Sequence, residues 1–444
     1  MKLWKKGFSL LLLTAAVWAL MQSFAPAKLE RSKVIKKDFD AKSAVAANHQ
    51  YGPLTIKKSG DGRIHLEAEM LLTGSDEESI EDVLGRFDVE VAESPTELRL
   101  ETDLGIEGCN TINNRMTIKY KDGHKVKGIN EMTVKMTLFV PNPERLSLEN
   151  KYDRIELADD YNGALRVSLY SGDLVAANLG GSLDLELKYG KAKLQNIGMA
   201  KLEIYDSEVR TGDVQQAEVS SKYSQFVMGD VAGNLKLQTY DEHWQVGSVG
   251  GQLTLDDKYS DFKFANIGGA SMMLFDAEFT AEEVGNMEIR DTKYSAYKIT
   301  TAGSLKLGNV FDDEYRVQVA GRIEAEDSKY TEYRVGKLGK QFTLRQSFDD
   351  TVELEGVAAD FNQIGIDGKY TELTLSIAEG AQFKFEVDMK YGKVNYPDRR
   401  VETRKHLEKD SQITIEGNVG AAQTGGQVNS LKLSGFDNTL EWRD

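Results

Sequence analysis

The feature that most constrains the fold of this chain is a unit of about 18 residues that recurs along most of its length. In the copy at residues 250–269, apolar residues alternate with polar ones on both sides of Tyr259, a pattern typical of two short strands joined by a bend. The alternating apolar residues are Leu253, Leu255, Phe262, Phe264 and Ile267. One such pair of strands cannot bury its apolar face alone, so the copies must pack on one another.

Each copy carries an aromatic residue at its bend. Every second aromatic follows a lysine, as in Lys258-Tyr259, and most of the others precede an acid, as in Phe275-Asp276. The repeat is therefore a pair of coils of about 36 residues. Tyr51 and Phe436 obey the same spacing rules outside the main run. The aromatics of the main run are Tyr152, Tyr170, Tyr189, Tyr205, Tyr223, Tyr240, Tyr259, Phe275, Tyr294, Phe311, Tyr330, Phe348, Tyr370 and Tyr391.

Two architectures fit this pattern, a parallel solenoid and an antiparallel meander. The meander would need roughly thirty strands in one open sheet, whereas about ten is the usual limit. We therefore predict an all-β fold, a right-handed parallel β-helix in which each corner aromatic lies directly over the next, about 4.8 Å away. Lysine corners would then alternate with acidic corners, which favours a single register. Phe262, Phe264 and Ile267 should point inward and stack on Val246 and Val249 of the preceding coil.

The first 27 residues have the pattern of a secretory signal peptide. Lys2, Lys5 and Lys6 precede an apolar run that is short for a membrane span, and Ala25 and Ala27 form a cleavage signal. The alternative is an uncleaved anchor. No cysteine lies near the cleavage point, so we expect a protein that is exported to the periplasm, cell surface or medium and is not a lipoprotein. After cleavage the chain would have no membrane span.

Residues 28–143 break the rhythm of the repeat and are predicted to form an N-terminal lead-in and cap. A helix is expected over 75–86, with a capping box of Ser75 and Glu78. Its apolar face would be Ile80, Val83, Leu84 and Phe87. Strands are expected at about 63–72, 87–91, 96–102, 115–120 and 131–140.

Residues 144–397 are predicted to be the parallel β-helix, and residues 398–444 a C-terminal insertion and closing coil. Within this last part, 399–410 is charged and expected to be exposed, 411–442 is expected to close the far end, and 421–427 is a glycine-rich loop without the features of a phosphate loop.

The repeat motifs resemble those of a known family. NKYDRIEL at 150–157, LKYGKAKLQNI at 187–197 and SKYSQFVMGDVAG at 221–233 are similar to the repeats of the bacterial putative-adhesin β-helix domains. The segment LFVPNPERLSLENKY at 138–152 resembles the lead into their coils. The resemblance implies a secreted β-helix of a largely uncharacterised, Bacteroidota-type family and a non-enzymatic envelope or surface protein. It implies no catalytic residues.

Charge and cysteine content exclude several classes of partner and linkage. The formal net charge is −16, which argues against nucleic acid and anionic lipid, because both require a cationic face. Cys109 is the single cysteine, so no internal disulfide is possible.

The sequence offers weak candidates for chemistry. The five histidines show no metal-ligand spacing, and His243 is expected to be solvated. The acidic pairs Asp159-Asp160, Asp256-Asp257, Asp312-Asp313 and Asp349-Asp350 are the kind of groups that a sugar-cleaving enzyme uses, but we interpret them as solvated corner acids. Gly172-Asp173, Gly212-Asp213 and Gly229-Asp230 read as turns.

No aromatic stripe is expected on the outer faces, because Trp244, Phe262 and Phe264 fall at inward positions. We therefore assign no catalytic, cofactor-binding or metal-binding residue and no cofactor. The sequence favours a non-enzymatic, adhesin-like protein of the envelope or surface that presents a long β-helix to an envelope protein or a glycan. A carbohydrate-active β-helix enzyme and a periplasmic envelope-stress scaffold are the alternatives. The sequence leaves the oligomeric state open.

Overall fold

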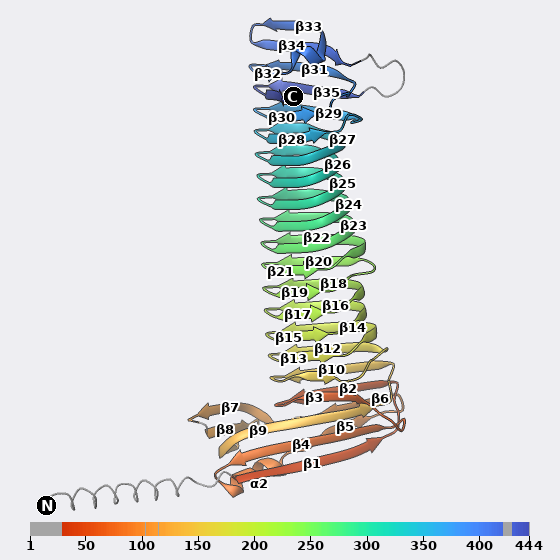
Figure 1. Ribbon diagram of the computed structural model, residues 1–444. Helices are drawn as coiled ribbons and strands as arrows, with labels where there is room; N and C mark the ends of the chain where they lie inside the picture. Colours follow the sequence, from red (N-terminus) through yellow and green to blue (C-terminus); the bar gives the residue numbers. More distant parts are fainter. Residues whose placement is uncertain (1–28, 103, 114, 421–428, 444) are drawn as a thin grey trace, which may run out of the picture. The chain divides into compact units, whose positions relative to one another are not determined.

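The structure is a computed structural model that describes residues 29–102, 104–113, 115–420 and 429–443 (Figure 1). The chain divides into two compact units, residues 1–143 with 147–156, and residues 144–146 with 157–444. In the described ranges, no helix is long and apolar enough to cross a membrane. The predicted signal peptide at 1–27 and the glycine-rich loop at 421–427 lie outside the described residues.

The first unit is built on a three-stranded antiparallel sheet. β1 (Leu29–Phe39) and β9 (Lys125–Val140) flank β4 (Ile64–Gly74). Parallel pairs are added where β2 (Ala44–Gln50) joins β6 (Glu97–Glu101) and β3 (Leu54–Lys58) joins β9. The remaining strands are β5 (Glu90–Glu93), β7 (Ile106–Ile112), β8 (Arg115–Tyr120), β10 (Arg145–Lys151) and β11 (Ile155–Leu157). The unit thus combines an antiparallel sheet with parallel strand pairs of the kind found between coils of a solenoid.

The single α-helix of the described chain is α2 (Glu77–Gly85). Its N-cap is Asp76, whose side chain accepts a hydrogen bond from the Ser79 backbone N–H at 3.0 Å, so the predicted capping box of Ser75 and Glu78 is wrong. The reason is that the Ser75 backbone N–H already donates to the Gly128 carbonyl at 3.0 Å, which holds Ser75 with the sheet. The predicted apolar face is confirmed, because Ile80, Val83, Leu84 and Phe87 are all buried.

The second unit is a parallel β-solenoid with coils of about 18 residues, as the sequence predicted. Each strand pairs in parallel with the strand one coil later, for example Leu165 with Leu183, and Figure 1 shows these strands stacked coil upon coil. This pairing excludes the antiparallel meander. The strands are β12 (Ala164–Tyr170), β13 (Asp173–Ala176), β14 (Leu179–Lys188), β15 (Lys191–Leu194), β16 (Ile197–Tyr205), β17 (Glu208–Thr211), β18 (Val214–Lys222), β19 (Gln225–Met228), β20 (Leu235–Tyr240), β21 (His243–Val246), β22 (Val249–Lys258), β23 (Asp261–Phe275), β24 (Glu278–Lys293), β25 (Ala296–Phe311), β26 (Glu314–Lys329), β27 (Glu332–Phe348), β28 (Thr351–Val357), β29 (Gln363–Lys369), β30 (Glu372–Ile377), β31 (Phe383–Lys390) and β32 (Lys393–Asn395).

The bend opposite the corner aromatics is held by side chains in the early coils. The Asp213 carboxylate accepts from the Asp230 backbone N–H at 3.1 Å, and the Asp230 carboxylate accepts from the Ser248 N–H at 2.7 Å. These contacts confirm the predicted turn role of Gly212-Asp213 and Gly229-Asp230. In later coils glycine takes over, since a Cβ on Gly303 would lie 2.3 Å from the Gly285 carbonyl oxygen.

The last two strands of the chain lie between earlier strands of the solenoid. β35 (Ser430–Phe436) lies between β29 and β31 and pairs in parallel with both, and β36 (Thr439–Arg443) likewise pairs with β30 and β32. The outermost strands are β34 (Gln412–Val419) and β33 (Val401–Lys409), which pair antiparallel after the short 3₁₀ helix η1 (Asp398–Arg400). The charged segment at 399–410 is largely exposed, as expected, but it forms an edge strand.

The predicted core of the coil around Tyr259 is confirmed. Phe264 pairs with Val246 and Ile267 with Val249, while Phe262 lies on Trp244. All six side chains are buried. Aromatic stacking continues through this core, since the Phe226 and Trp244 rings lie 3.8 Å apart and nearly parallel.

Truncating one core residue should therefore destabilise the fold, whereas its neighbour should not matter. Phe264→Ala should lower the free energy of unfolding by ~3–5 kcal/mol, the usual cost of removing a buried aromatic ring. Lys263→Ala, on the exposed side of the same strand, should change it by no more than about 0.5 kcal/mol. Chemical denaturation of both variants measures the difference, and equal effects would contradict the inward position of Phe264.

A cross-link tests the stacking directly. Gln245 and Lys263 are parallel partners on adjacent strands, so their Cα atoms should lie about 4.8 Å apart, within the range that a disulfide spans. With Cys109 replaced by serine, Gln245→Cys/Lys263→Cys should oxidise readily to an intramolecular disulfide, as seen by gel mobility under non-reducing conditions. A folded double variant that stays reduced would overturn the parallel register.

Candidate functional site

The corner that carries the aromatic residues turns through one residue of left-handed backbone conformation in each coil. In the lysine copies this residue is the tyrosine itself, with φ of 70° at Tyr259 and 58° at Tyr294. In the other copies it is the residue after the aromatic, with φ of 53° at Asp276 and 54° at Asp312. Aspartate and asparagine tolerate this conformation better than most residues, which explains the acid that recurs after the aromatic in those copies.

Because of this difference, the corner aromatics do not lie directly over one another in the backbone register. Lys258 is the parallel partner of Phe275, and Phe275 in turn is the partner of Lys293. Lysine and aromatic residues therefore alternate in one column, and tyrosine and aspartate alternate in the next. The prediction of a single column of aromatics is wrong by one residue in every second coil.

The aromatic rings of both columns nevertheless form one continuous line, which we call the aromatic spine. Successive ring centroids lie 5.4–5.7 Å apart with interplanar angles of 65–86°, which is edge-to-face packing. In spatial order the spine is Tyr170, Tyr189, Tyr205, Tyr223, Tyr240, Tyr259, Phe275, Tyr294, Phe311, Tyr330, Phe348, Tyr370, Phe436 and Tyr391.

The spine is accessible from solvent. The tyrosines at left-handed positions are about half exposed, with values such as 44% for Tyr259 and 48% for Tyr294. The expectation that the outer faces carry no aromatic stripe is therefore wrong. The exposed rings lie at the bends and not on the flat strand faces, and the recurrence of an aromatic residue at every bend is the sequence signal for them.

Charged residues border the spine on its two sides. In the column just before the left-handed residue, lysines alternate with aromatic residues. In the left-handed column, aspartates alternate with tyrosines. The lysine ion pairs run along their own strand, from Lys188 to Glu186 at 2.7 Å and from Lys329 to Asp327 at 2.9 Å. The alternation of lysine and acidic corners therefore reflects two neighbouring columns, and not the single ladder of opposite charges that the sequence favoured.

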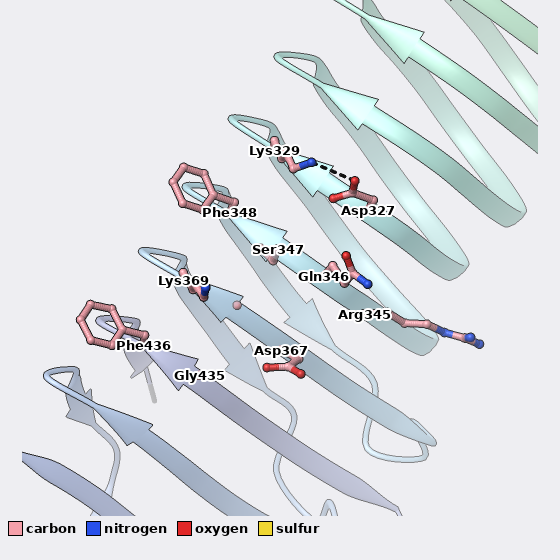
Figure 2. Close-up of a pocket in the computed structure, with 11 residues that line it drawn as sticks. Asp327, Lys329, Arg345, Gln346, Ser347, Phe348, Asp367, Lys369, Gly435 and Phe436 are labelled. Atoms are coloured by element: carbon pink, nitrogen blue, oxygen red, sulfur yellow. Dashed lines mark hydrogen bonds and ion pairs between the residues drawn. The ribbon is translucent and has the colours of Figure 1, made fainter.

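A pocket of about 410 Å³ lies on the lysine side of the spine, where Gly368 and Gly435 supply no side chains. Figure 2 shows Phe348 and Phe436 beside this pocket, with Lys329 and Lys369 on the coils that alternate with them. Aromatic surface and cationic groups thus meet in a shallow depression of the corner.

The acidic pairs are not uniformly solvated, contrary to the sequence interpretation. Asp256, Asp312 and Asp349 are exposed, but Asp257, Asp313 and Asp350 are each no more than 4% exposed. Each of these three pairs therefore directs one carboxyl group outward and one inward. Two such groups cannot flank the same glycosidic bond, as a glycosidase requires. Asp159 and Asp160 are both exposed, as expected.

Asp313 and Asp350 belong to a buried polar ladder just behind the spine. The Asp313 carboxyl accepts from the Ser295 backbone N–H at 2.6 Å, and the Asp350 carboxyl accepts from the Thr331 N–H at 2.9 Å. Each side chain thus binds the backbone of the preceding coil in the stack. The ladder consists of Ser207, Ser224, Glu242, Ser260, Ser295, Asp313, Thr331, Asp350, Thr371 and Asn438.

Burial raises the pKa values of the ladder carboxyls. It raises the pKa of Glu242 to about 8, that of Asp313 to about 7 and that of Asp350 to about 6. Among the described atoms, Oε1 of Glu242 and Oδ2 of Asp313 have no hydrogen-bond partner, which also disfavours their ionisation. These carboxyls are enclosed in the core, so their role lies in the fold.

The stability of the protein should consequently fall as these carboxyls ionise. Their pKa values are higher in the folded than in the unfolded chain, so their full contribution is present below pH 4 and is lost as the pH rises to about 8. Asp313→Asn keeps the acceptor for Ser295 and removes the ionisation, as Asn438 does naturally for the Thr371 N–H. Between pH 5 and pH 8 the variant should lose less stability than the wild type, by on the order of a few kcal/mol.

Denaturant unfolding at several pH values measures this difference. The control is Asp312→Asn, at an exposed left-handed position that asparagine tolerates, which should keep the pH dependence of the wild type. The same pH dependence in the wild type and Asp313→Asn would contradict the buried, neutral carboxyl.

The histidines are not gathered into a site. His49 is buried and contacts the Val134 carbonyl at 2.8 Å, and burial lowers its pKa to about 4. His243 is exposed, as expected, and pairs with Asp261 at 2.9 Å. Among the residues that the structure describes, no group of three or more His, Cys, Asp or Glu side chains could hold a metal ion.

The fold and the corner thus define a parallel β-solenoid with an exposed aromatic edge. The chain matches no protein-family model and no curated protein. Solved structures to which it is similar include a putative adhesin from Bacteroides fragilis (14% identity, 60% of this chain and 97% of that one, TM-score 0.27). They also include a putative cell adhesion protein from Clostridium sporogenes (9%, 94% and 100%, 0.16) and a putative lipid binding protein from Parabacteroides distasonis (8%, 68% and 94%, 0.22).

The two adhesin names belong to the class that the repeat motifs of this sequence resemble.

Proposed function

We propose that this chain is an exported, non-enzymatic binding protein of the cell envelope or surface, with an adhesin-like role. The observation that carries the proposal is the aromatic spine, an exposed row of rings that runs from Tyr170 to Tyr391 with charged residues on both sides. Exposed aromatic surface of this extent, rimmed by polar groups, is typical of interaction sites.

The geometry of the spine supports binding to an extended ligand. The coils repeat at about 4.8 Å and the lysine–aromatic alternation at about twice that distance, so the same chemical pattern is offered again and again along one edge. Tyrosine suits such a surface because its ring offers apolar contact area and its hydroxyl remains available for hydrogen bonds. A long partner could bind through many weak, equivalent contacts.

Two observations support a non-enzymatic role. The buried carboxyls of the acidic pairs are enclosed in the core, and their partners in each pair face the opposite way. General acid–base catalysis needs groups within hydrogen-bond reach of the substrate. The predicted signal peptide at 1–27 supports export.

Replacing spine tyrosines should abolish binding without unfolding the chain. The labelled chain of residues 28–444 should bind saturably to at least one surface among immobilised mucin, peptidoglycan and insoluble polysaccharides. Replacement of Tyr259, Tyr294, Tyr330 and Tyr370 by asparagine, which tolerates left-handed backbone, should weaken that binding at least tenfold. Fluorescence binding isotherms measure both values.

The matched control is Lys298→Ser/Lys306→Ser, because both lysines are exposed on strand β25 away from the spine. This variant should bind like the wild type. Equal binding by the spine variant would refute the role of the spine. Turnover of a polysaccharide that disappears when Asp256 or Asp312 is replaced by asparagine would refute the non-enzymatic role.

A further inference from the structure

A second hollow, of about 630 Å³, opens on the aspartate side of the spine between Tyr189 and Tyr223. The corner residues that line it, Gly190, Ser207 and Ser224, have small side chains. A Cβ on Gly190 would lie 1.9 Å from the Gly172 carbonyl oxygen, so the first of these positions admits only glycine.

The walls of the hollow combine rings with hydrogen-bonding groups. Tyr189 and Tyr223 are 46% and 47% exposed and lie two coils, or about 10 Å, apart along the stack. Asp206 lies between them in the left-handed column, and Asp241 follows Tyr223. Lys191, Gln225 and His243 offer N–H donors from the adjoining strands. Acceptors and donors therefore alternate around two aromatic rings.

The charges of the hollow restrict the ligand. Asp173, Asp206, Glu208 and Asp241 outnumber the cationic Lys191, so an acidic polymer would be repelled. Lys191 is itself paired with Glu208 at 3.2 Å. A ligand that is polar but uncharged can use the donors and the acceptors together, whereas a basic peptide would use only the acceptors and would be repelled by Lys191.

We propose that this hollow is a binding subsite for an uncharged oligosaccharide of more than one sugar unit, held by Tyr189 and Tyr223 and by hydrogen bonds from its hydroxyl groups to Asp206 and Asp241. The inference rests on the proposed function, since it names the ligand class that one part of the spine selects. Sugar rings present an apolar face that packs on aromatic rings and a rim of hydroxyls that needs both donors and acceptors, which is the combination found here.

The test is calorimetric titration of the chain at residues 28–444 with three soluble neutral probes: chitohexaose, cellohexaose and laminarihexaose. At least one should bind saturably. Tyr189→Asn/Tyr223→Asn should weaken that binding at least tenfold while the chain stays folded, because asparagine tolerates the left-handed backbone. Asp206→Asn/Asp241→Asn, which keeps shape and backbone but removes the charge, should weaken it several-fold.

The matched control is Lys298→Ser/Lys306→Ser, which changes two exposed lysines of β25 outside both the spine and the hollow and should bind the probe like the wild type. The inference is overturned if none of the three probes binds, if this control loses as much affinity as the Tyr189/Tyr223 variant, or if hexalysine binds the hollow and the sugars do not. If the chain binds the surfaces but none of the oligosaccharides, the subsite is refuted and the proposed function stands. If the chain does not bind the surfaces, the proposed function is refuted, and the titration still tests the subsite.

Discussion

The left-handed corner is the constraint on which the rest of the second unit depends. Every coil must reverse direction at the same point of the stack, and it does so through one residue with φ near 60°. For a bulky residue such as tyrosine this conformation costs on the order of 1–3 kcal/mol. Each edge-to-face contact with a ring of a neighbouring coil stabilises the fold by about 0.5–1.5 kcal/mol. The rings therefore offset the strain of the backbone that positions them, which is a physical reason for an aromatic at every corner.

The same corner explains the buried polar ladder. A backbone that leaves the strand conformation exposes N–H groups that no neighbouring strand can accept, and buried N–H groups must find partners. Serine, aspartate and asparagine side chains of the following coil accept these N–H groups. Where the acceptor is a carboxyl, as in Asp313 and Asp350, burial keeps it from ionising freely and links the stability of the solenoid to pH.

A functional surface arises from these structural needs. Rings that stabilise the corner on their inner edges remain about half exposed on their outer edges, and charged residues fill the alternate positions. The hollow between Tyr189 and Tyr223 is one place where rings, acids and N–H donors meet on this surface. Binding specificity can thus vary along the stack while the fold stays constant.

The sequence by itself determined the period of the coils, the parallel stacking, the inward positions of Phe262, Phe264 and Ile267, and the apolar face of α2, because alternation and spacing report directly which side of an element is buried. It did not reveal that aromatics in alternate coils are offset by one residue, since the offset follows from which residue takes the left-handed conformation. Nor did it show that Asp257, Asp313 and Asp350 are buried, because a charged residue in a pattern looks solvated until the neighbouring coil supplies its partners. The placement of β35 between β29 and β31 was likewise decided only by the tertiary structure. All strands of the repeat share the same alternation of apolar and polar residues, so the sequence pattern does not say which strands become neighbours, and packing does.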